Sequence, residues 1–80
     1  MKSINVQYFA LLREQRGVES ESINVSCRTY ADLYLHLKDT HKFTLPIEMI
    51  QVAVNDEFSH MNLEVLDGAK IVFIPPVAGG

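Results

Sequence analysis

The residues of this sequence that could do chemistry stand at its C-terminal end, which reads Pro75-Pro76-Val77-Ala78-Gly79-Gly80. The two prolines stiffen this segment and prevent strand pairing, and the small residues after them leave a narrow arm. Six extended residues reach about 20 Å, enough to enter a deep pocket in a partner. The terminal group is an unhindered carboxylate with an ordinary pKa of about 3.5. We therefore expect residues 75–80 to form a projecting tail that carries its reactive group on Gly80.

A carboxylate is a poor electrophile, so Gly80 would need activation before it could carry a group. Joining the carboxylate to AMP supplies a good leaving group, and a sulfur nucleophile could then displace AMP and leave a thiocarboxylate. A flexible arm with a reactive end is typical of group carriers, in which the protein supplies reach and orientation. The alternative is an ordinary frayed terminus. Two glycines directly after an apolar strand and two prolines favour the carrier.

The other reactive side chains predict no second site. His36 and His41 are separated by about 140° around a helix, and His60 is remote in sequence. The only cysteine, Cys27, has no general base beside it in the sequence and is interpreted as a packing residue. We expect all three histidines at the surface, no metal site, and no cofactor bound by this chain.

The composition argues against several classes of partner. Seven Lys and Arg against ten Asp and Glu give a formal net charge of −3, and no two basic residues are adjacent. Phosphate binding needs a clustered basic face, so we expect no nucleic-acid partner. No apolar stretch is long enough for a secretory signal or a membrane span. We expect no membrane association and, with a single unpaired cysteine, a cytoplasmic protein.

The elements that must position the tail are typical of one small α+β domain over residues 1–74. Apolar and polar residues alternate over 3–9 and 21–26, which predicts two strands that pair as a hairpin around a short helical turn ending at Gly17. The clearest helix begins after Thr29, with Asp32 in the position of a capping-box acid, and ends before Pro46.

Two or three further strands follow this helix. Residues 51–54 form a short apolar strand, and a turn at Asn55-Asp56 leads into Glu57-Phe58. Residues 70–74 form an unbroken apolar run, typical of a strand covered on both faces in the middle of a sheet. A helix crossover would place this last strand parallel to the first, in a mixed sheet of four to five strands.

Three segments carry a resemblance over essentially the whole chain: the opening VQYFALLREQRG, the middle VAVN and the ending DGAKIVFIPPVAGG. The sequence resembles the small, sulfur-carrying subunits of molybdopterin synthase, which are ubiquitin-like proteins of the β-grasp fold. Ala78 stands where that family usually has a small hydroxylated residue. Alanine at this position is similar to the sulfur carrier of thiamine synthesis.

The resemblance implies a mechanism and two partners. An E1-like adenylyltransferase consumes ATP to adenylate Gly80, and sulfur from a persulfide donor replaces AMP to give a thiocarboxylate. The tail then enters the large subunit of molybdopterin synthase and donates sulfur to a cyclic pyranopterin monophosphate. Two small and two large subunits would form a heterotetramer, and the large subunit would supply the catalytic side chains.

The same resemblance implies partner contacts at Phe9, Phe58, Ile74 and Arg13. The alternative is a core position for the three apolar residues and ordinary solvent exposure for Arg13. Three classes of function stay open at this point. They are a molybdopterin synthase subunit, a sulfur carrier for thiamine or a related product, and a ubiquitin-like modifier or plain binding domain.

Overall fold

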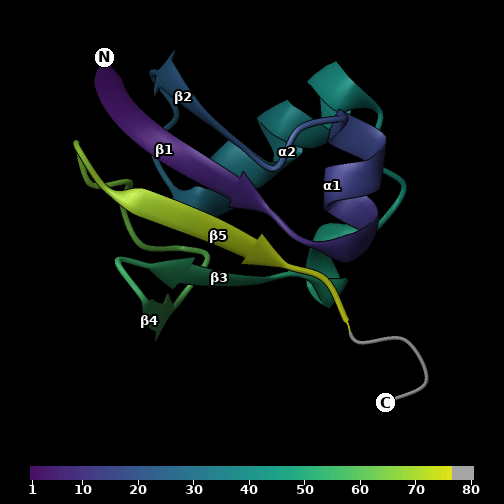
Figure 1. Ribbon diagram of the computed structural model, residues 1–80. Coiled ribbons are helices and arrows are strands. Elements are labelled where there is room, and N and C mark those ends of the chain that lie inside the picture. The colour runs from purple at the N-terminus through teal and green to yellow at the C-terminus, as the bar shows by residue number, and fades with distance from the viewer. Residues whose placement is uncertain (77–80) are drawn as a thin grey trace.

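The computed structural model describes residues 1–76 and contains five strands and two α-helices (Figure 1). In chain order the elements are β1 (Lys2–Tyr8), α1 (Ala10–Arg16), β2 (Ser20–Val25), α2 (Tyr30–His41), the 3-10 turn η1 (Ile47–Met49), β3 (Gln51–Val54), β4 (Glu57–Ser59) and β5 (Lys70–Ile74). The predicted α+β class and the predicted order of strands and main helix are confirmed.

All five strands form one sheet in the order β2-β1-β5-β3-β4. β1 and β5 are parallel, with Val6 opposite Ile71 and Tyr8 opposite Phe73, and the other three strand pairs are antiparallel. The predicted hairpin of the first two strands and the central, parallel position of the last strand are confirmed. β5 is buried at three successive residues, and it lies in the middle of the sheet between β1 and β3.

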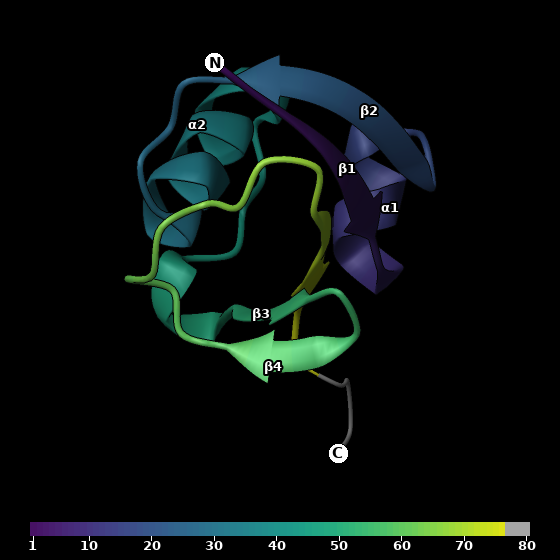
Figure 2. The same ribbon diagram turned by 90° about the vertical axis from the view of Figure 1, so that its left-hand side faces the viewer.

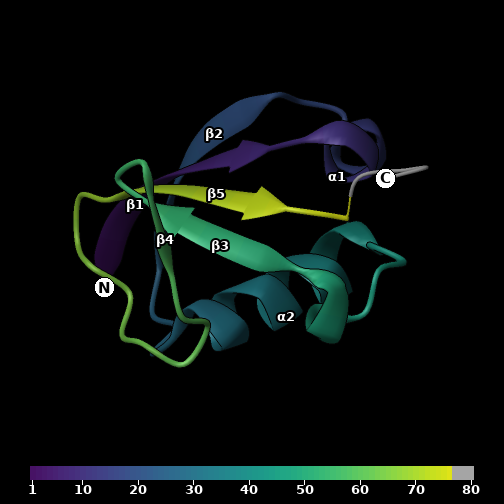
Figure 3. The ribbon, with the colours of Figure 1, turned by 90° about the horizontal axis from the view of Figure 1, so that it is seen from below.

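Helix α2 lies along one face of the sheet (Figure 3). It begins where the sequence predicts, because the Thr29 hydroxyl accepts a hydrogen bond from the Asp32 backbone and the Asp32 carboxylate accepts one from the Thr29 backbone. The core between helix and sheet is almost entirely aliphatic and aromatic. Its largest fully buried side chains are Tyr8, Tyr30, Tyr34, Phe73, Leu12, Leu33 and Ile71.

The alternation of each strand sends a second set of side chains to the opposite face of the sheet. On that face Gln7 of β1 lies opposite Val72 of β5, Val72 lies opposite Ala53 of β3, and Ala53 lies opposite Phe58 of β4. Phe58 is 73% exposed. The face away from α2 therefore carries an apolar band, formed by Val72, Ala53 and Phe58, which ends in the exposed ring of Phe58.

No helix within residues 1–76 is both long enough and apolar enough to cross a membrane. The two ends of the described chain lie at opposite ends of the sheet, because β1 starts where β5 starts and β5 ends beside α1 (Figures 1 and 2). The residues that lead to the C-terminus therefore leave the domain from the centre of the sheet.

Candidate functional site

The last described residues of the chain leave the domain beside a groove. The parallel strands β1 and β5 end at the same edge of the sheet, so Phe9 and Ile74, which follow the paired residues Tyr8 and Phe73, come together. They line a hollow of about 710 Å³. We call it the exit groove; its residues are Phe9, Ala10, Leu11, Arg13, Glu14, Ile74, Pro75 and Pro76.

Helix α1 forms one wall of the exit groove, beside the end of β5 (Figures 1 and 3). It begins directly after β1, with Phe9 still extended, and ends at Gly17, which takes the left-handed φ of 89° that glycine adopts readily. The fully buried Leu12 fixes the helix to the core. Because neighbouring positions on a helix point in different directions, Leu11 and Arg13 then face the groove.

The groove is apolar and partly open to solvent. Phe9 is 48% exposed, Leu11 is also exposed, and Ile74 is half-buried. Phe9 and Phe58 are therefore not core residues, whereas Ile74 is shared between the sheet and the groove. Arg13 is an exposed cation at the rim. The groove can receive an apolar side chain of a partner, and Arg13 at its rim can pair with a carboxylate of the same partner.

The structure brings three of the four predicted partner contacts together in this groove and places the fourth, Phe58, in the edge strand β4. Ile74 and Val72 point to the same face because they are two residues apart in β5. Val72 connects through Ala53 to Phe58. The apolar band therefore runs from the exit groove to β4 on one face of the domain. Partner contact at these four positions stays a prediction.

The first residue of the predicted tail, Pro75, is buried, whereas a projecting residue was expected. Pro75 is buried and Pro76 is exposed, so the chain is packed against the domain through Pro75. Val77, Ala78, Gly79 and Gly80 lie outside the described residues, and the predictions made for them stay predictions.

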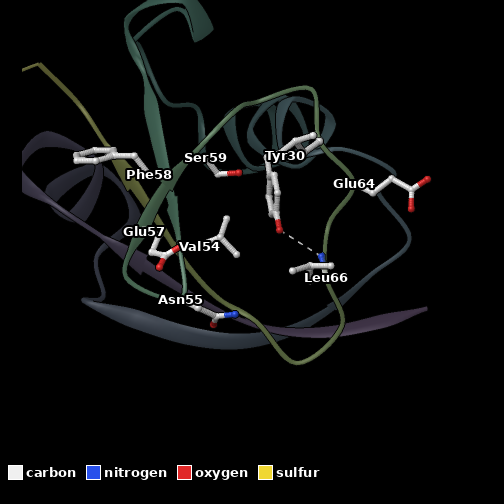
Figure 4. A pocket seen from close by; sticks show the side chains of 9 residues that line it. Tyr30, Val54, Asn55, Glu57, Phe58, Ser59, Glu64 and Leu66 are labelled. Atoms are coloured by element: carbon white, nitrogen blue, oxygen red, sulfur yellow. Dashed lines mark hydrogen bonds between the residues drawn. The ribbon is translucent and has the colours of Figure 1, made fainter.

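A second hollow lies at the other end of the sheet, between the β3–β4 hairpin and the segment before β5 (Figure 4). Its volume is about 580 Å³, and the Tyr30 hydroxyl accepts a hydrogen bond of 3.3 Å from the Leu66 backbone beside it. Glu57 and Glu64 lie on opposite sides of it, and the Glu64 carboxylate points away from the hollow (Figure 4). The sequence did not predict this hollow, although it places two leucines, Leu63 and Leu66, in a segment with neither helix nor strand periodicity.

The most highly connected polar group of the described chain is Glu21 of β2. Arg16 donates from Nε and Nη2 to the two Glu21 oxygens at 2.8 and 2.7 Å, and the Tyr8 hydroxyl donates to Oε2 at 2.6 Å. The hydrogen bonds from Arg16 are the main cause that lowers the pKa of Glu21 to about 2. Burial and the adjacent carboxylate raise the pKa of Tyr8 above its ordinary value.

His41 belongs to the same cluster, which corrects the expectation that all three histidines lie at the surface. Its Nε2 lies 3.9 Å from Glu21 Oε2, and its ring packs 5.7 Å from that of Phe43. Burial, and then the charge of Arg16, lower the pKa of His41. The side chain is drawn inward because α2 ends against the aromatic core, which the sequence pattern does not reveal. His36 and His60 are exposed, as predicted.

The described residues offer no metal site, since no three His, Cys, Asp or Glu side chains between 1 and 76 are grouped to hold an ion. Cys27 is half-buried and packs against the core. Burial and the charge of Asp32 raise the pKa of its thiol, which leaves it a poor nucleophile. The packing role predicted for Cys27 fits this environment.

The five-stranded mixed sheet, its single covering helix and the central exit of the chain define a ubiquitin-like protein of the β-grasp fold. The ThiS family matches residues 6–80, and the chain belongs to that family.

The similarity to individual relatives extends over nearly all of the chain. The molybdopterin synthase sulfur carrier subunit of Haemophilus influenzae is 32% identical over 80 residues, covering 96% of this chain and 99% of the relative. SAMP1 from Haloferax volcanii is 25% identical with a TM-score of 0.76, covering 98% and 99% of the two chains. A chain of the Amycolatopsis orientalis BexX/CysO complex is 26% identical with a TM-score of 0.65, covering 96% and 99%.

Proposed function

We propose that this chain is the sulfur-carrier subunit of a molybdopterin synthase and that its reactive group is the carboxylate of Gly80. The observation that carries the proposal is the likeness to the sulfur carrier subunit of Haemophilus influenzae along essentially the full length of both chains. The C-terminal Gly79-Gly80 and the exit groove support it.

The proposed reaction needs three steps on Gly80. Its carboxylate attacks ATP to form a mixed anhydride with AMP, and pyrophosphate leaves. A persulfide sulfur of the donor then attacks the carbonyl carbon and displaces AMP, which gives an acyl disulfide between Gly80 and the donor. A second thiol cleaves the S–S bond of this intermediate, forms a disulfide with the donor and releases Gly80 as a thiocarboxylate. That sulfur is finally donated to a cyclic pyranopterin monophosphate. An E1-like adenylyltransferase would perform the first step and consume the ATP, so this chain needs no cofactor of its own.

The domain contributes reach and docking in this proposal. The exit groove and the apolar band to Phe58 form the surface that would contact the large synthase subunit, while the tail enters its active site. Exposed aromatic rings such as Phe9 and Phe58 supply much of the binding energy when an interface buries them. We propose that two such small subunits and two large subunits form a heterotetramer, and that the protein acts in the cytoplasm.

A second candidate is a sulfur carrier or modifier of another system. The likeness to SAMP1, a small archaeal modifier protein, supports it, as does Ala78. A thiamine-type carrier would form the same thiocarboxylate but donate to a different acceptor. A modifier would instead join Gly80 to a lysine through an isopeptide bond.

Mass spectrometry of the C-terminal peptide tests the proposal. The chain is incubated with cell extract, ATP and a sulfur source, and is then cleaved after lysine, so that Ile71–Gly80 is released. This peptide contains no methionine, which matters because exchange of oxygen for sulfur changes the mass almost as methionine oxidation does. We expect an ATP-dependent exchange that a thiol alkylator labels. A sample without ATP is the control.

Each outcome has one meaning. Labelled sulfur on Gly80 supports a sulfur carrier, and transfer to a cyclic pyranopterin monophosphate with the large subunit then identifies the pathway. Lysine-linked adducts with an unmodified free Gly80 would assign the chain to the modifiers. No change at Gly80 would contradict both and leave a binding domain.

A further inference from the structure

Helix α1 forms a wall of the exit groove, yet it is too short to hold its own position. It has seven residues, and isolated helices shorter than about 12 residues are marginal in water. Its N-terminus has no side-chain cap, and Ala10 adopts a left-handed φ of 50°. The position of α1 must therefore come from contacts with the rest of the domain.

Two polar contacts fix the C-terminal half of α1. Gln15 donates to the Thr44 hydroxyl at 2.8 Å and accepts from the Thr44 backbone at 3.2 Å, which connects α1 to the segment after α2. Arg16 makes the bidentate pair with Glu21, which connects α1 to β2. A bidentate pair between guanidinium and carboxylate fixes direction as well as distance.

Glu21 is unusually well suited to hold a helix in place. It lies on the edge strand β2 opposite Val6, on the face of the sheet where the core lies, and its side chain is only 19% exposed. Its two oxygens accept three hydrogen bonds, from Arg16 twice and from Tyr8 once. Glu21 is itself a residue of β2, so the backbone of the sheet fixes the position of the carboxylate that holds α1, and the hydrogen bond from the buried Tyr8 adds stability.

We propose that Arg16 and Glu21 are positioning residues for partner binding, because their pair holds α1 so that Leu11 and Arg13 form the wall of the exit groove. This inference rests on the proposed function, in which that groove receives the large subunit. Neither residue lines the groove, so both act through the helix.

The test compares four variants of the full-length chain, one of which is the double variant Arg16→Gln/Glu21→Gln. Arg16→Gln and Glu21→Gln each remove the charged bidentate pair. Tyr8→Phe is the matched control, because it removes a hydrogen bond to the same carboxylate and leaves the connection between Glu21 and α1 intact. The dissociation constant of each variant with the purified large synthase subunit is measured by calorimetry, at a temperature where circular dichroism shows each variant fully folded.

We expect each glutamine variant to bind about tenfold more weakly than the wild type. The double variant should bind no more weakly than either single one, because the two changes remove one connection. Tyr8→Phe should bind within about twofold of the wild type even where its thermal midpoint falls. Backbone amides of Leu12–Gly17 should exchange with solvent faster in the glutamine variants than in Tyr8→Phe.

Two results overturn the inference while the proposed function stands. One is wild-type affinity in both glutamine variants. The other is an equal loss of affinity in Tyr8→Phe, which would mean that general destabilisation is responsible. A wild-type chain that does not bind the large subunit would overturn the proposed function, and the positioning role with it.

Discussion

Phe9 and Ile74 come from opposite ends of the chain and line the same groove, because Phe9 follows β1, Ile74 ends β5, and these two strands are parallel neighbours. Tyr8, the last residue of β1, lies opposite Phe73, so Phe9 leaves β1 beside Ile74, the last residue of β5. The chain passes this point on its way to the C-terminus. A partner that receives the tail must therefore approach the groove.

Replacing the exposed aromatic residues should weaken binding to the large subunit without unfolding the domain. We expect Phe9→Ser and Phe58→Ser to reduce affinity about tenfold or more, since each ring would lose its burial in the interface. Calorimetric titration of the purified subunits measures this. Leu35→Ser is the matched control for Phe9, because Leu35 is 47% exposed on α2, away from the groove. Equal losses in the Leu35 variant would contradict the assigned surface.

Removing Gly80 should abolish sulfur transfer and leave stability unchanged. The proposed reactive carboxylate would be displaced by one residue, whereas the core described within residues 1–76 should keep its contacts. Thermal unfolding and a sulfur-transfer assay measure the two effects. An added residue after Gly80 should block adenylation in the same way. Activity retained by that extended chain would show that the terminal carboxylate is not the reactive group.

The stability of the fold should depend on acid through Glu21. Its pKa falls from an ordinary 4.5 to about 2 on folding, so the charged form stabilises the folded state above about pH 4.5. This stabilisation is lost as the pH falls from 4.5 towards 2. We expect Glu21→Gln to lower the free energy of unfolding by about 1–3 kcal/mol at pH 7.

Urea unfolding of the wild type and Glu21→Gln at pH 7, 5, 4 and 3 measures this dependence. The difference between the two proteins should shrink as the pH falls below 4.5, because protonation removes the charge that the variant already lacks. A difference that stays constant over this range would mean that the charge of Glu21 does not stabilise the fold.

The turn between β3 and β4 should depend on Asn55 for two separate reasons. Asn55 has a left-handed φ of 51°, which asparagine tolerates better than alanine, and its Oδ1 accepts a hydrogen bond of 3.0 Å from the Lys70 backbone. We expect Asn55→Ala to lower the free energy of unfolding by about 1–2 kcal/mol. Asn55→Gly keeps the backbone freedom and loses only the hydrogen bond, so it should lower the free energy of unfolding by less than Asn55→Ala does. If urea unfolding gave the same decrease in the free energy of unfolding for both variants, backbone strain at this position would be unimportant.

Local patterns in the sequence were sufficient for most of the fold. Alternation predicted the first two strands, the Thr29–Asp32 spacing predicted the start of α2, and the unbroken run at 70–74 predicted a central strand. These features depend on backbone periodicity or on residues within one turn, so a single sequence displays them. The inward position of His41 was not predicted, because it depends on how the end of α2 meets Phe43 and Glu21.

The candidate site likewise has one part that the sequence predicts and another that only the tertiary structure reveals. The sequence by itself determined the composition on which the chemistry proposed for the C-terminus rests, since two prolines, small residues and a terminal glycine are a local property of the chain. Only the tertiary structure brought Phe9, Arg13 and Ile74 into one groove and joined Arg16 to Glu21 behind it. Such contacts join residues from different elements, and they exist only when sheet order and strand register fix where each element ends.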